Sequence, residues 1–300
     1  MSKHLNYPVG LRAVTDRNQR LREALAAETL LMAPGCFDCL SAKLVAKAGF
    51  SAAYITGSGV SMSTIGAPDM GVISFSEVID RARRIADCVN IPLICDADTG
   101  YGGPINVIRT VQEFERAGLS AIQIEDQVWP KKCGHEPGRK LVSIAEMVGR
   151  IKAAVDARVD EDFVVVARTD ARSSHGLNEA IERAARYQEA GADVLFVESP
   201  ETKEEMAEIN RQLKAPTLAN MVEGGRTPLA NATELQSLGY SLAIYPNSLT
   251  RLFAFQGARM LAELNATGST DGFKGEMLDH RALWDLFDYP EWTALEERFS

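Results

Sequence analysis

Short runs of apolar and β-branched residues alternate with longer amphipathic stretches along most of this 300-residue chain. This alternation is typical of parallel strands joined by crossover helices. It predicts eight strands, at residues 30–33, 52–56, 92–95, 121–125, 164–168, 194–198, 217–220 and 242–245. The amphipathic stretches predict helices at 38–48, 76–89, 104–117, 143–158, 178–190, 202–213, 231–238 and 248–264.

Four of these helices end in a glycine just before the next apolar run, at Gly49, Gly118, Gly191 and Gly239. Glycine readily adopts the left-handed conformation that closes a helix. We therefore expect each of these glycines to mark the point where a helix turns into a connection to the next strand.

Eight strand–helix repeats over about 235 residues match the size of a closed (β/α)8 TIM-type barrel. An open doubly wound sheet is the alternative, but no G-x-G-x-x-G turn joins its first strand to a helix. No Pro, Ser or Gly-rich linker divides the repeats. We therefore expect an α/β fold in which residues 1–300 form one domain, with an N-terminal helix near 17–28 and the barrel over about 30–265.

The last segment, residues 268–300, is far more aromatic than the rest of the chain and contains Trp284, Phe287, Tyr289, Trp292 and Phe299. A completed barrel offers such side chains little room on its own surface. We expect a helical tail that docks on a neighbouring subunit, with packing on its own barrel as the alternative.

Composition narrows the class of protein further. The chain is 46% hydrophobic and 24% charged, with 41 acidic and 32 basic residues and a net charge of -9. This balance argues against nucleic acid as a partner. No apolar run reaches the roughly 18 residues of a membrane helix, and the start lacks a signal-like apolar core. We expect a cytoplasmic protein with no membrane partner, whose five scattered cysteines are reduced.

Polar residues close seven of the eight apolar runs, and in a parallel barrel the carboxyl ends of the strands meet at one mouth. They are Thr56, Gly57, Ser58 and Gly59, Asp96 and Asp98, Glu125 and Asp126, Arg168, Thr169 and Asp170, Glu198, Asn220 and Glu223, and Asn247 and Ser248. Crowded carboxylates raise one another's pKa unless a cation intervenes. Oxygen donors without a nearby His or Cys pair favour Mg²⁺, or Mn²⁺, over zinc. Helix capping is the alternative role for Asp96 and Asp98.

A long loop with unusual chemistry follows the fourth strand. Cys133 lies there between Lys131, Lys132 and His135, with glycines on either side of Glu136 and Pro137. Cationic neighbours stabilise a thiolate, and glycines allow a loop to open and close. We expect Cys133 to act as an acid or base on a mobile lid.

The motifs together resemble the isocitrate lyase and phosphoenolpyruvate mutase superfamily over almost the whole chain. They are YITGSG at 54–59, DADTGYG at 96–102, IEDQ at 124–127, KKCGH at 131–135, ARTD at 167–170 and NMVEGG at 220–225. The resemblance implies a Mg²⁺-dependent barrel that assembles as a homotetramer and exchanges its C-terminal helix between neighbours. It places Asp96 as the direct metal ligand, with Asp69, Asp98 and Glu125 acting through bound waters.

The resemblance also assigns roles around the substrate. Tyr54, Thr56, Gly57 and Ser58 would hold the carboxylate of a pyruvate-like fragment, and Arg168 would bind its oxygen. The catalytic set would be Cys133, Arg168, Tyr54, His135 and Lys131, with Gly134 beside them. The far carboxylate or alkyl group would contact Glu198, Asn220, Thr227, Pro228 and Ser248. Tyr54, Arg168 and hydroxide on the metal stay open as the group that removes the hydroxyl proton.

A Lys-x-Cys-Gly-His loop marks the carbon–carbon lyases of this superfamily, and segment 220–228 resembles dimethylmalate and alkylmalate lyases. The resemblance thus implies cleavage of a 2-hydroxy dicarboxylate, of the 2,3-dimethylmalate or 2-alkylmalate type, to pyruvate or another 2-oxoacid plus a carboxylate. The alternatives are a 2-methylisocitrate lyase, which forms pyruvate and succinate, and an oxaloacetate hydrolase or decarboxylase. The alternative that is not an enzyme is a non-catalytic barrel that only binds a dicarboxylate.

Overall fold

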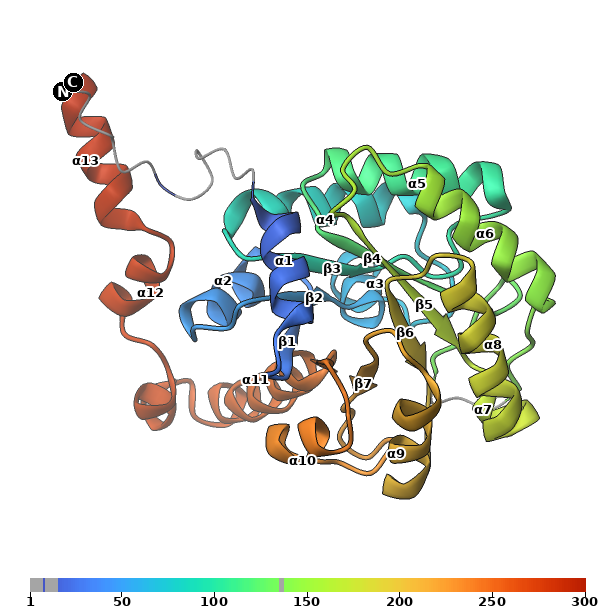
Figure 1. Cartoon of the computed structure of the whole chain (residues 1–300). Helices are drawn as coiled ribbons and strands as arrows, with labels where there is room; N and C mark the ends of the chain where they lie inside the picture. Colours follow the sequence, from blue (N-terminus) through green and yellow to red (C-terminus); the bar gives the residue numbers. More distant parts are fainter. Residues whose placement is uncertain (1–7, 9–15, 135–137) are drawn as a thin grey trace.

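Eight parallel strands form a barrel surrounded by helices (Figure 1), which confirms the predicted TIM-type fold. The computed structural model describes residues 8, 16–134 and 138–300. Neighbouring strands follow the order β6-β5-β4-β3-β2-β1-β8-β7, and a parallel bridge between Leu195 and Thr217 joins the two ends of this sheet. The strands are β1 (Leu31–Cys36), β2 (Ala53–Ile55), β3 (Leu93–Asp96), β4 (Ala121–Glu125), β5 (Val164–Thr169), β6 (Val194–Val197), β7 (Leu218–Asn220) and β8 (Leu242–Tyr245).

The helices cover the outside of the barrel and continue into a tail. Around the barrel lie α1 (Arg17–Ala26), α2 (Cys39–Lys47), α3 (Gly57–Ile65), α4 (Phe75–Cys88), α5 (Pro104–Arg116), α6 (Ile144–Asp156), α7 (Arg172–His175), α8 (Leu177–Glu189), α9 (Lys203–Gln212), α10 (Ala232–Ser237) and α11 (Ser248–Thr267). The tail adds a 3-10 helix, η2 (Asp271–Glu276), and the helices α12 (His280–Leu286) and α13 (Tyr289–Phe299). No helix in the described ranges is long and apolar enough to cross a membrane.

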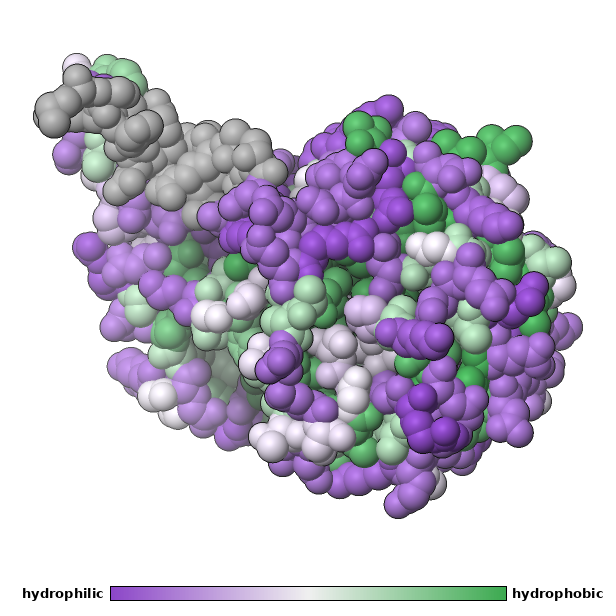
Figure 2. All heavy atoms as spheres, viewed as in Figure 1, coloured by the Kyte–Doolittle hydropathy of each residue, from purple (hydrophilic) through white to green (hydrophobic). Residues whose placement is uncertain are grey.

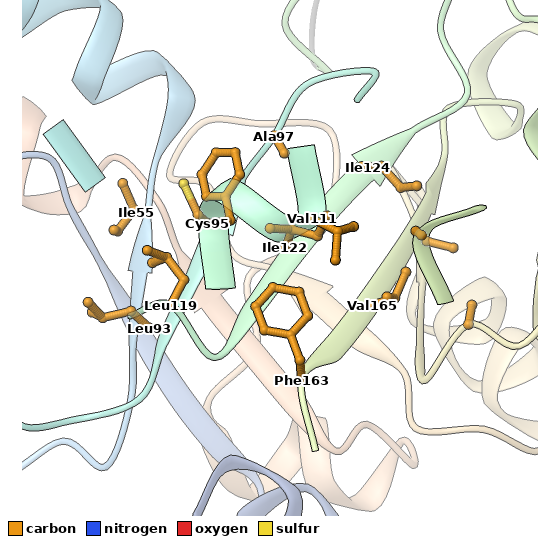
Figure 3. Close-up of a cluster of buried hydrophobic side chains, with 14 of the residues drawn as sticks. Ile55, Leu93, Cys95, Ala97, Val111, Leu119, Ile122, Ile124, Phe163 and Val165 are labelled. Carbon is orange, nitrogen blue, oxygen red and sulfur yellow. The ribbon is translucent and has the colours of Figure 1, made fainter. Parts of the chain in front are cut away.

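The strands are buried on both faces, as their nearly continuous apolar runs predict. In β4, Ile122 and Ile124 pack outward against the helices in the cluster drawn in Figure 3, together with Val111 of α5. The alternate residues Gln123 and Glu125 therefore face the barrel interior, because successive side chains point to opposite faces of a strand. This alternation places polar groups inside the barrel without interrupting the outer hydrophobic core.

The glycines predicted to end helices adopt that role. The φ angles of Gly49, Gly118, Gly191 and Gly239 are 86°, 84°, 102° and 96°. These positive angles lie outside the range that other residues favour, so the four glycines close α2, α5, α8 and α10 as predicted.

Two parts of the barrel differ from the predicted pattern. Strand β1 runs on past residue 33 to Cys36, and a Cβ on Gly35 would overlap the backbone of Pro246, so only glycine lets the end of β8 approach there. Helix α3 begins at Gly57, directly after β2, although its glycines and serines are poor helix formers. Thr56 caps α3 by accepting a hydrogen bond from the Gly59 amide.

The C-terminal tail extends away from the barrel (Figure 1). An ion pair of 2.8 Å between Lys43 Nζ of α2 and Asp288 Oδ2 joins it to the barrel. The tail aromatics Trp284, Phe287, Tyr289, Trp292 and Phe299 are 38% to 73% exposed. Lys43 Nζ also lies over the ring of Phe287 at 5.8 Å, so part of the tail contacts its own barrel. Docking of the remaining aromatic side chains on a neighbour stays a prediction.

The remaining surface agrees with the charged composition. Figure 2 shows that hydrophilic residues dominate the face seen there, with apolar residues gathered in separate patches between them. All five cysteines are free thiols, as their scattered positions predict.

Candidate active site

The carboxyl ends of β2 to β8 surround a small cavity of about 40 Å³, which we call the inner cavity. It is lined by Tyr54, Thr56, Ser58, Asp69, Asp96, Cys133, Gly134, Arg168, Phe196, Glu198, Asn220, Val222, Ile244, Pro246 and Asn247. The predicted mouth of the barrel is therefore where most of the predicted site residues meet. Cys133, in the loop after β4, and Asp96, at the end of β3, line the same space.

A second cavity of about 760 Å³, the outer cavity, lies next to the inner one. It is lined by Ser58, Met62, Pro68, Asp69, Met70, Lys132, Cys133, Val222, Glu223, Gly224, Gly225, Asn247, Thr250 and Arg251. The two cavities share Ser58, Asp69, Cys133, Val222 and Asn247. A substrate bound in the inner cavity thus has direct access to the outer one.

Carboxylates from two loops gather around a lysine of the lid. Lys131 Nζ lies 2.8 Å from Asp98 Oδ1 and also pairs with Asp69. The amide of Asp98 donates a hydrogen bond of 3.0 Å to Asp96 Oδ1. The lid is therefore held over the carboxylates by a buried cation of its own.

Burial and crowding shift the protonation of these groups. Burial raises the pKa of Asp98 to about 6, and the carboxylates of Asp96 and Asp69 add to this shift while Lys131 opposes it. Burial likewise raises the pKa of Asp96 and of Glu125 above their ordinary values. The prediction that these carboxylates raise one another's pKa is confirmed, although burial is the larger cause.

Glu125 is fully buried, and neither of its carboxylate oxygens accepts a hydrogen bond from the described residues. Arg168 Nη1 lies 3.2 Å from Glu125 Oε2 but is also close to other carboxylates. Buried oxygens without hydrogen bonds are costly, so a further positively charged or donating group is expected here.

The donor set fits a hard divalent cation. No three His, Cys, Asp or Glu side chains within the described ranges are arranged to hold a metal ion by themselves. Mg²⁺ usually takes only one or two carboxylates and keeps several waters. A Cβ on Gly57 would lie 2.8 Å from Asp96 Oδ2, so glycine is what allows this carboxylate to lie against the start of α3. Asp96, together with Glu125 at the end of β4, offers the oxygen donors that such an ion prefers.

The start of α3 forms the part of the inner cavity best suited to an anion. Thr56 and Ser58 lie in its first turn, where backbone amides without helical partners point out of the helix end. Tyr54 lies beneath them and donates a hydrogen bond of 2.7 Å from its hydroxyl to Gln123 Oε1. Burial raises the pKa of Tyr54 well above its ordinary value, so its phenol stays protonated and acts as a donor.

Arg168 of β5 provides the buried positive charge on the opposite side of the cavity. Its Nη2 lies 2.9 Å from Asp170 Oδ1 and 3.6 Å from Glu198 Oε2, and its guanidinium lies over the ring of Phe196 at 5.2 Å. Burial alone would lower the pKa of Arg168, but the surrounding carboxylates raise it well above its ordinary value. Arg168 therefore remains charged.

The loop that carries Cys133 is anchored at its base. Gln127 and Leu141 form an antiparallel bridge, and the Val128 amide donates a hydrogen bond of 2.8 Å to the Lys140 carbonyl. The Gln127 side chain donates to the Lys132 carbonyl at 2.9 Å and accepts from the Lys132 amide at 3.0 Å. Gln127 thereby fixes the backbone next to Cys133.

Gly134 of this loop packs against residues that follow β6. Ser199 donates a hydrogen bond of 3.2 Å from its hydroxyl to the carbonyl of Gly134. A Cβ on Gly134 would collide with the guanidinium of Arg168 and the side chain of Glu198. The absence of a side chain at Gly134 is therefore what lets the loop close over the cavity.

Some predicted site residues are not among the described residues that line the two cavities. His135 is outside the described residues. Thr227, Pro228 and Ser248 line neither cavity, whereas Glu198 and Asn220 line the inner one and are joined by a hydrogen bond of 3.0 Å from Asn220 Nδ2.

Sequence reasoning also missed several residues of the site, among them Phe196 and Val222 in the cavity lining and Gln123 beside it, and it grouped Asp126 with the residues of the mouth. Gln123 links Tyr54 to Asp96, with its Nε2 3.4 Å from Asp96 Oδ1. The alternation within β4 was a usable signal, because Gln123 and Glu125 share a face. Asp126 points the other way, and its Oδ2 accepts hydrogen bonds from Thr169 at 2.7 Å and Tyr187 at 2.8 Å. Asp126 thus ties the barrel to its outer helices and takes no part in the site.

Known proteins are similar to this chain over most of its length. The family model described as phosphoenolpyruvate phosphomutase matches residues 21–264. The chain is 46% identical over 281 residues to the 2,3-dimethylmalate lyase of Eubacterium barkeri, covering 94% of this chain and 97% of that protein. It is 41% identical over 281 residues to a 2-methylisocitrate lyase of Halalkalibacterium halodurans, covering 94% and 93% respectively.

Solved structures are also similar to this chain over most of its length. An oxaloacetate acetylhydrolase in complex with 3,3-difluorooxalacetate superposes with a TM-score of 0.89 at 35% identity, covering 94% of this chain and 96% of that one. A phosphonopyruvate hydrolase in complex with oxalate and Mg²⁺ superposes with a TM-score of 0.86 at 32% identity, covering 94% and 99%.

Proposed function

Because the chain belongs to the isocitrate lyase and phosphoenolpyruvate mutase superfamily, we propose that it is a Mg²⁺-dependent carbon–carbon lyase. The proposed substrate is a 2-hydroxy dicarboxylate of the 2,3-dimethylmalate or 2-alkylmalate type. Cleavage would yield pyruvate or another 2-oxoacid plus a carboxylate. The observation that carries this proposal is that Cys133 lines the same cavity as Asp96 and Arg168.

Substrate binding is proposed to use the two charged ends of the inner cavity. The first turn of α3, with Thr56, Gly57 and Ser58, would bind the carboxylate of the 2-oxoacid fragment through backbone amides and hydroxyls. Arg168 would bind the oxygen on C2 from the other side. These contacts orient the C2–C3 bond beneath the lid.

Asp96 would hold Mg²⁺ directly, with Asp69, Asp98 and Glu125 acting through bound waters. When bound, the ion supplies positive charge that stabilises the oxygens of the substrate as the bond breaks. The phosphonopyruvate hydrolase solved in complex with oxalate and Mg²⁺ supports a divalent ion in a related barrel. The burial that raises the pKa values of Asp96, Asp98 and Glu125 supports a cation beside these carboxylates.

The proposed reaction moves one proton off the alcohol and one onto carbon. As the C2 hydroxyl gives its proton to hydroxide, which becomes water, the C2–C3 bond breaks; C2 becomes the carbonyl of the 2-oxoacid, and the electron pair of the bond stays on C3 as a carboxylate enolate. Lys131, His135 and Arg168 would supply positive charge near this fragment. Cys133 would then donate the thiol proton to C3, so that 2,3-dimethylmalate gives pyruvate and propionate.

Neither Tyr54 nor Arg168 suits the role of base for the hydroxyl proton. The pKa of each lies well above its ordinary value, so at neutral pH each is already protonated. We therefore assign both residues to binding and charge stabilisation.

A substrate panel tests the proposal. The purified protein is mixed with MgCl2 and with 2,3-dimethylmalate, 2-ethylmalate, 2-methylisocitrate or oxaloacetate, and release of 2-oxoacid, oxalate and acetate is measured. We expect the highest kcat/KM with 2,3-dimethylmalate. A higher value with 2-methylisocitrate, in line with the 41% identical relative, would establish that alternative instead. Formation of oxalate and acetate alone would indicate an oxaloacetate hydrolase, and ligand binding without turnover would indicate a non-catalytic barrel.

The proposed assembly is a homotetramer whose C-terminal helices exchange between neighbours. Its support is the exposed aromatic surface of the tail, where Leu283, Trp284, Phe287, Tyr289 and Trp292 line a cavity of about 390 Å³. Exposed apolar surface of this kind usually marks a protein interface.

A further inference from the structure

The two cavities at the mouth of the barrel differ greatly in size, and Cys133 is one of the five residues that line both. The inner cavity of about 40 Å³ is far smaller than the outer one. The outer cavity of about 760 Å³ is large enough for a whole side chain of a substrate. The two fragments of a cleaved substrate therefore have different amounts of space available to their substituents.

We infer that the outer cavity binds an apolar substituent on C3 of the substrate, whereas the inner cavity restricts the substituent on C2 to a small group. This inference rests on the proposed function and extends it to the class of substrate. It predicts that the protein accepts 2-methylmalates with long C3 alkyl chains and rejects malates with long C2 chains.

The position of the thiol connects the two cavities to the two carbons. In the proposed reaction Cys133 donates its proton to C3, so C3 must lie beside the Cys133 sulfur. Cys133 lines both cavities, and a group attached to C3 at this point has the outer cavity in front of it. C2 and its substituent remain with the 2-oxoacid fragment, between the start of α3 and Arg168.

Apolar side chains form much of the wall of the outer cavity. Met62 and Met70 are 47% and 54% exposed, and Pro68 and Val222 lie beside them in the lining. Methionine is flexible and polarizable, so it adapts to chains of different lengths. This wall suits an alkyl group.

Among the described residues, the charged side chains that line the outer cavity balance one another. The basic residues Lys132 and Arg251 are matched by Asp69 and Glu223, and Arg251 Nη1 lies 3.6 Å from Glu223 Oε2. Asp69 also pairs with Lys131 of the lid. A carboxymethyl group on C3, as in 2-methylisocitrate, would meet two carboxylates as well as the two cations. The balance of charge therefore favours an alkyl substituent over a third carboxylate.

A substrate series tests the inference on the wild-type protein with Mg²⁺. One set carries methyl at C2 and methyl, propyl or carboxymethyl at C3; the other carries hydrogen at C3 and methyl, ethyl or propyl at C2. We expect kcat/KM to change less than about threefold between C3-methyl and C3-propyl. Each methylene added at C2 should lower it by about tenfold or more, because the inner cavity cannot expand. The carboxymethyl substrate should be cleaved less efficiently than the propyl one.

The variant Met62→Glu places a charge in the apolar wall and should lower the ratio of kcat/KM for C3-propyl over C3-methyl by at least about tenfold. Val159→Glu is the matched control, because Val159 is an exposed apolar residue in the loop before β5, at the opposite end of the barrel. It should leave this ratio at the wild-type value.

Three results would overturn the inference while the proposed function stands, the first two of them from the substrate series. One is cleavage of the C3-methyl substrate with loss of activity on C3-propyl; the other is a carboxymethyl substrate that is cleaved better than the propyl one. An unchanged ratio in Met62→Glu would likewise overturn it. Failure to release 2-oxoacid from any member of either set would overturn the proposed function itself.

Discussion

At the mouth of the barrel, neighbouring side chains restrict the size and charge of the residue that each position can hold. Gly134 must lack a side chain because Arg168 and Glu198 occupy the space that a Cβ would need. Glu125 is buried with carboxylate oxygens that accept no hydrogen bond from the described residues, which explains why a cation is expected beside it. Cys133 matters for its acidity, since a hydroxyl at the same place is a far weaker acid.

Replacement of the thiol tests the proposed proton donor. Cys133→Ser should lower kcat by about 100-fold or more, because the serine hydroxyl gives up its proton much less readily. Binding of Mg²⁺ and of pyruvate, measured by calorimetry, should change little. Turnover at the wild-type rate would refute the role of Cys133 as the donor.

A methyl group at position 134 tests closure of the lid. Gly134→Ala should lower kcat by about 100-fold. The added methyl group keeps the loop from packing against Arg168, and the Cys133 thiol then lies farther from C3 of the substrate. Gly257→Ala in α11 is the control, since a Cβ there meets open space. Equal activity of both variants would contradict the closed position of the loop as the active one.

At the scale of elements, helix α3 and the loop between β4 and α6 shape the site more than the strands do. Helix α3 starts immediately after β2, so its first turn points into the inner cavity. The lid hangs from a bridge between Gln127 and Leu141, and the Gln127 side chain holds the Lys132 backbone by two hydrogen bonds. The strands provide the frame on which these two elements are fixed.

Loss of this clamp should loosen the lid without removing any group that contacts substrate. In Gln127→Leu the Lys132 amide and carbonyl lose their partners, a change that costs about 1–3 kcal/mol in the closed loop. We expect kcat to fall about tenfold as the closed fraction falls. Trypsin, which cleaves after the lysines of the loop, should cut the variant faster.

Gln19→Leu, a change on the exposed face of α1, serves as the control for the clamp variant and should match the wild type in both assays. Wild-type proteolysis together with wild-type kcat in Gln127→Leu would show that the two hydrogen bonds do not hold the lid.

At the scale of the whole molecule, the barrel buries most of its apolar side chains, whereas the C-terminal tail leaves many of its own exposed. The barrel buries its apolar residues in an outer core under the helices and an inner core within the strands. The tail leaves Trp284 and Trp292 more than 40% exposed and is linked to α2 by one ion pair of Lys43 with Asp288. Such a surface is expected to be covered by a second copy of the chain.

Removing the aromatic side chains tests this assembly. The double variant Trp284→Ser, Trp292→Ser should lower the mass measured by light scattering from that of a tetramer to that of smaller species, because two large exposed apolar side chains of the tail are lost. Val159→Ser, a change on the barrel surface, should retain the wild-type mass. A tetramer that survives the double variant would contradict the role of the tail.

The sequence by itself determined the frame of this protein, because strands, helices and their ends depend on local patterns. Runs such as 121–125 are apolar over the length of a strand, and glycines such as Gly118 and Gly191 end helices through their own backbone freedom. The polar residues at the ends of the strands followed from the same pattern. The resemblance of the motifs then implied which of them share a site.

Only the tertiary structure decided how these residues face one another. Lys131 lies between Asp69 and Asp98 although 62 positions separate it from Asp69 in the chain. The neighbours Glu125 and Asp126 point to opposite faces of the barrel wall. The sizes of the inner and outer cavities depend on where a loop after β4 settles against β5 and β6. Such distances arise from the packing of distant segments, which no local pattern of apolar and polar residues encodes.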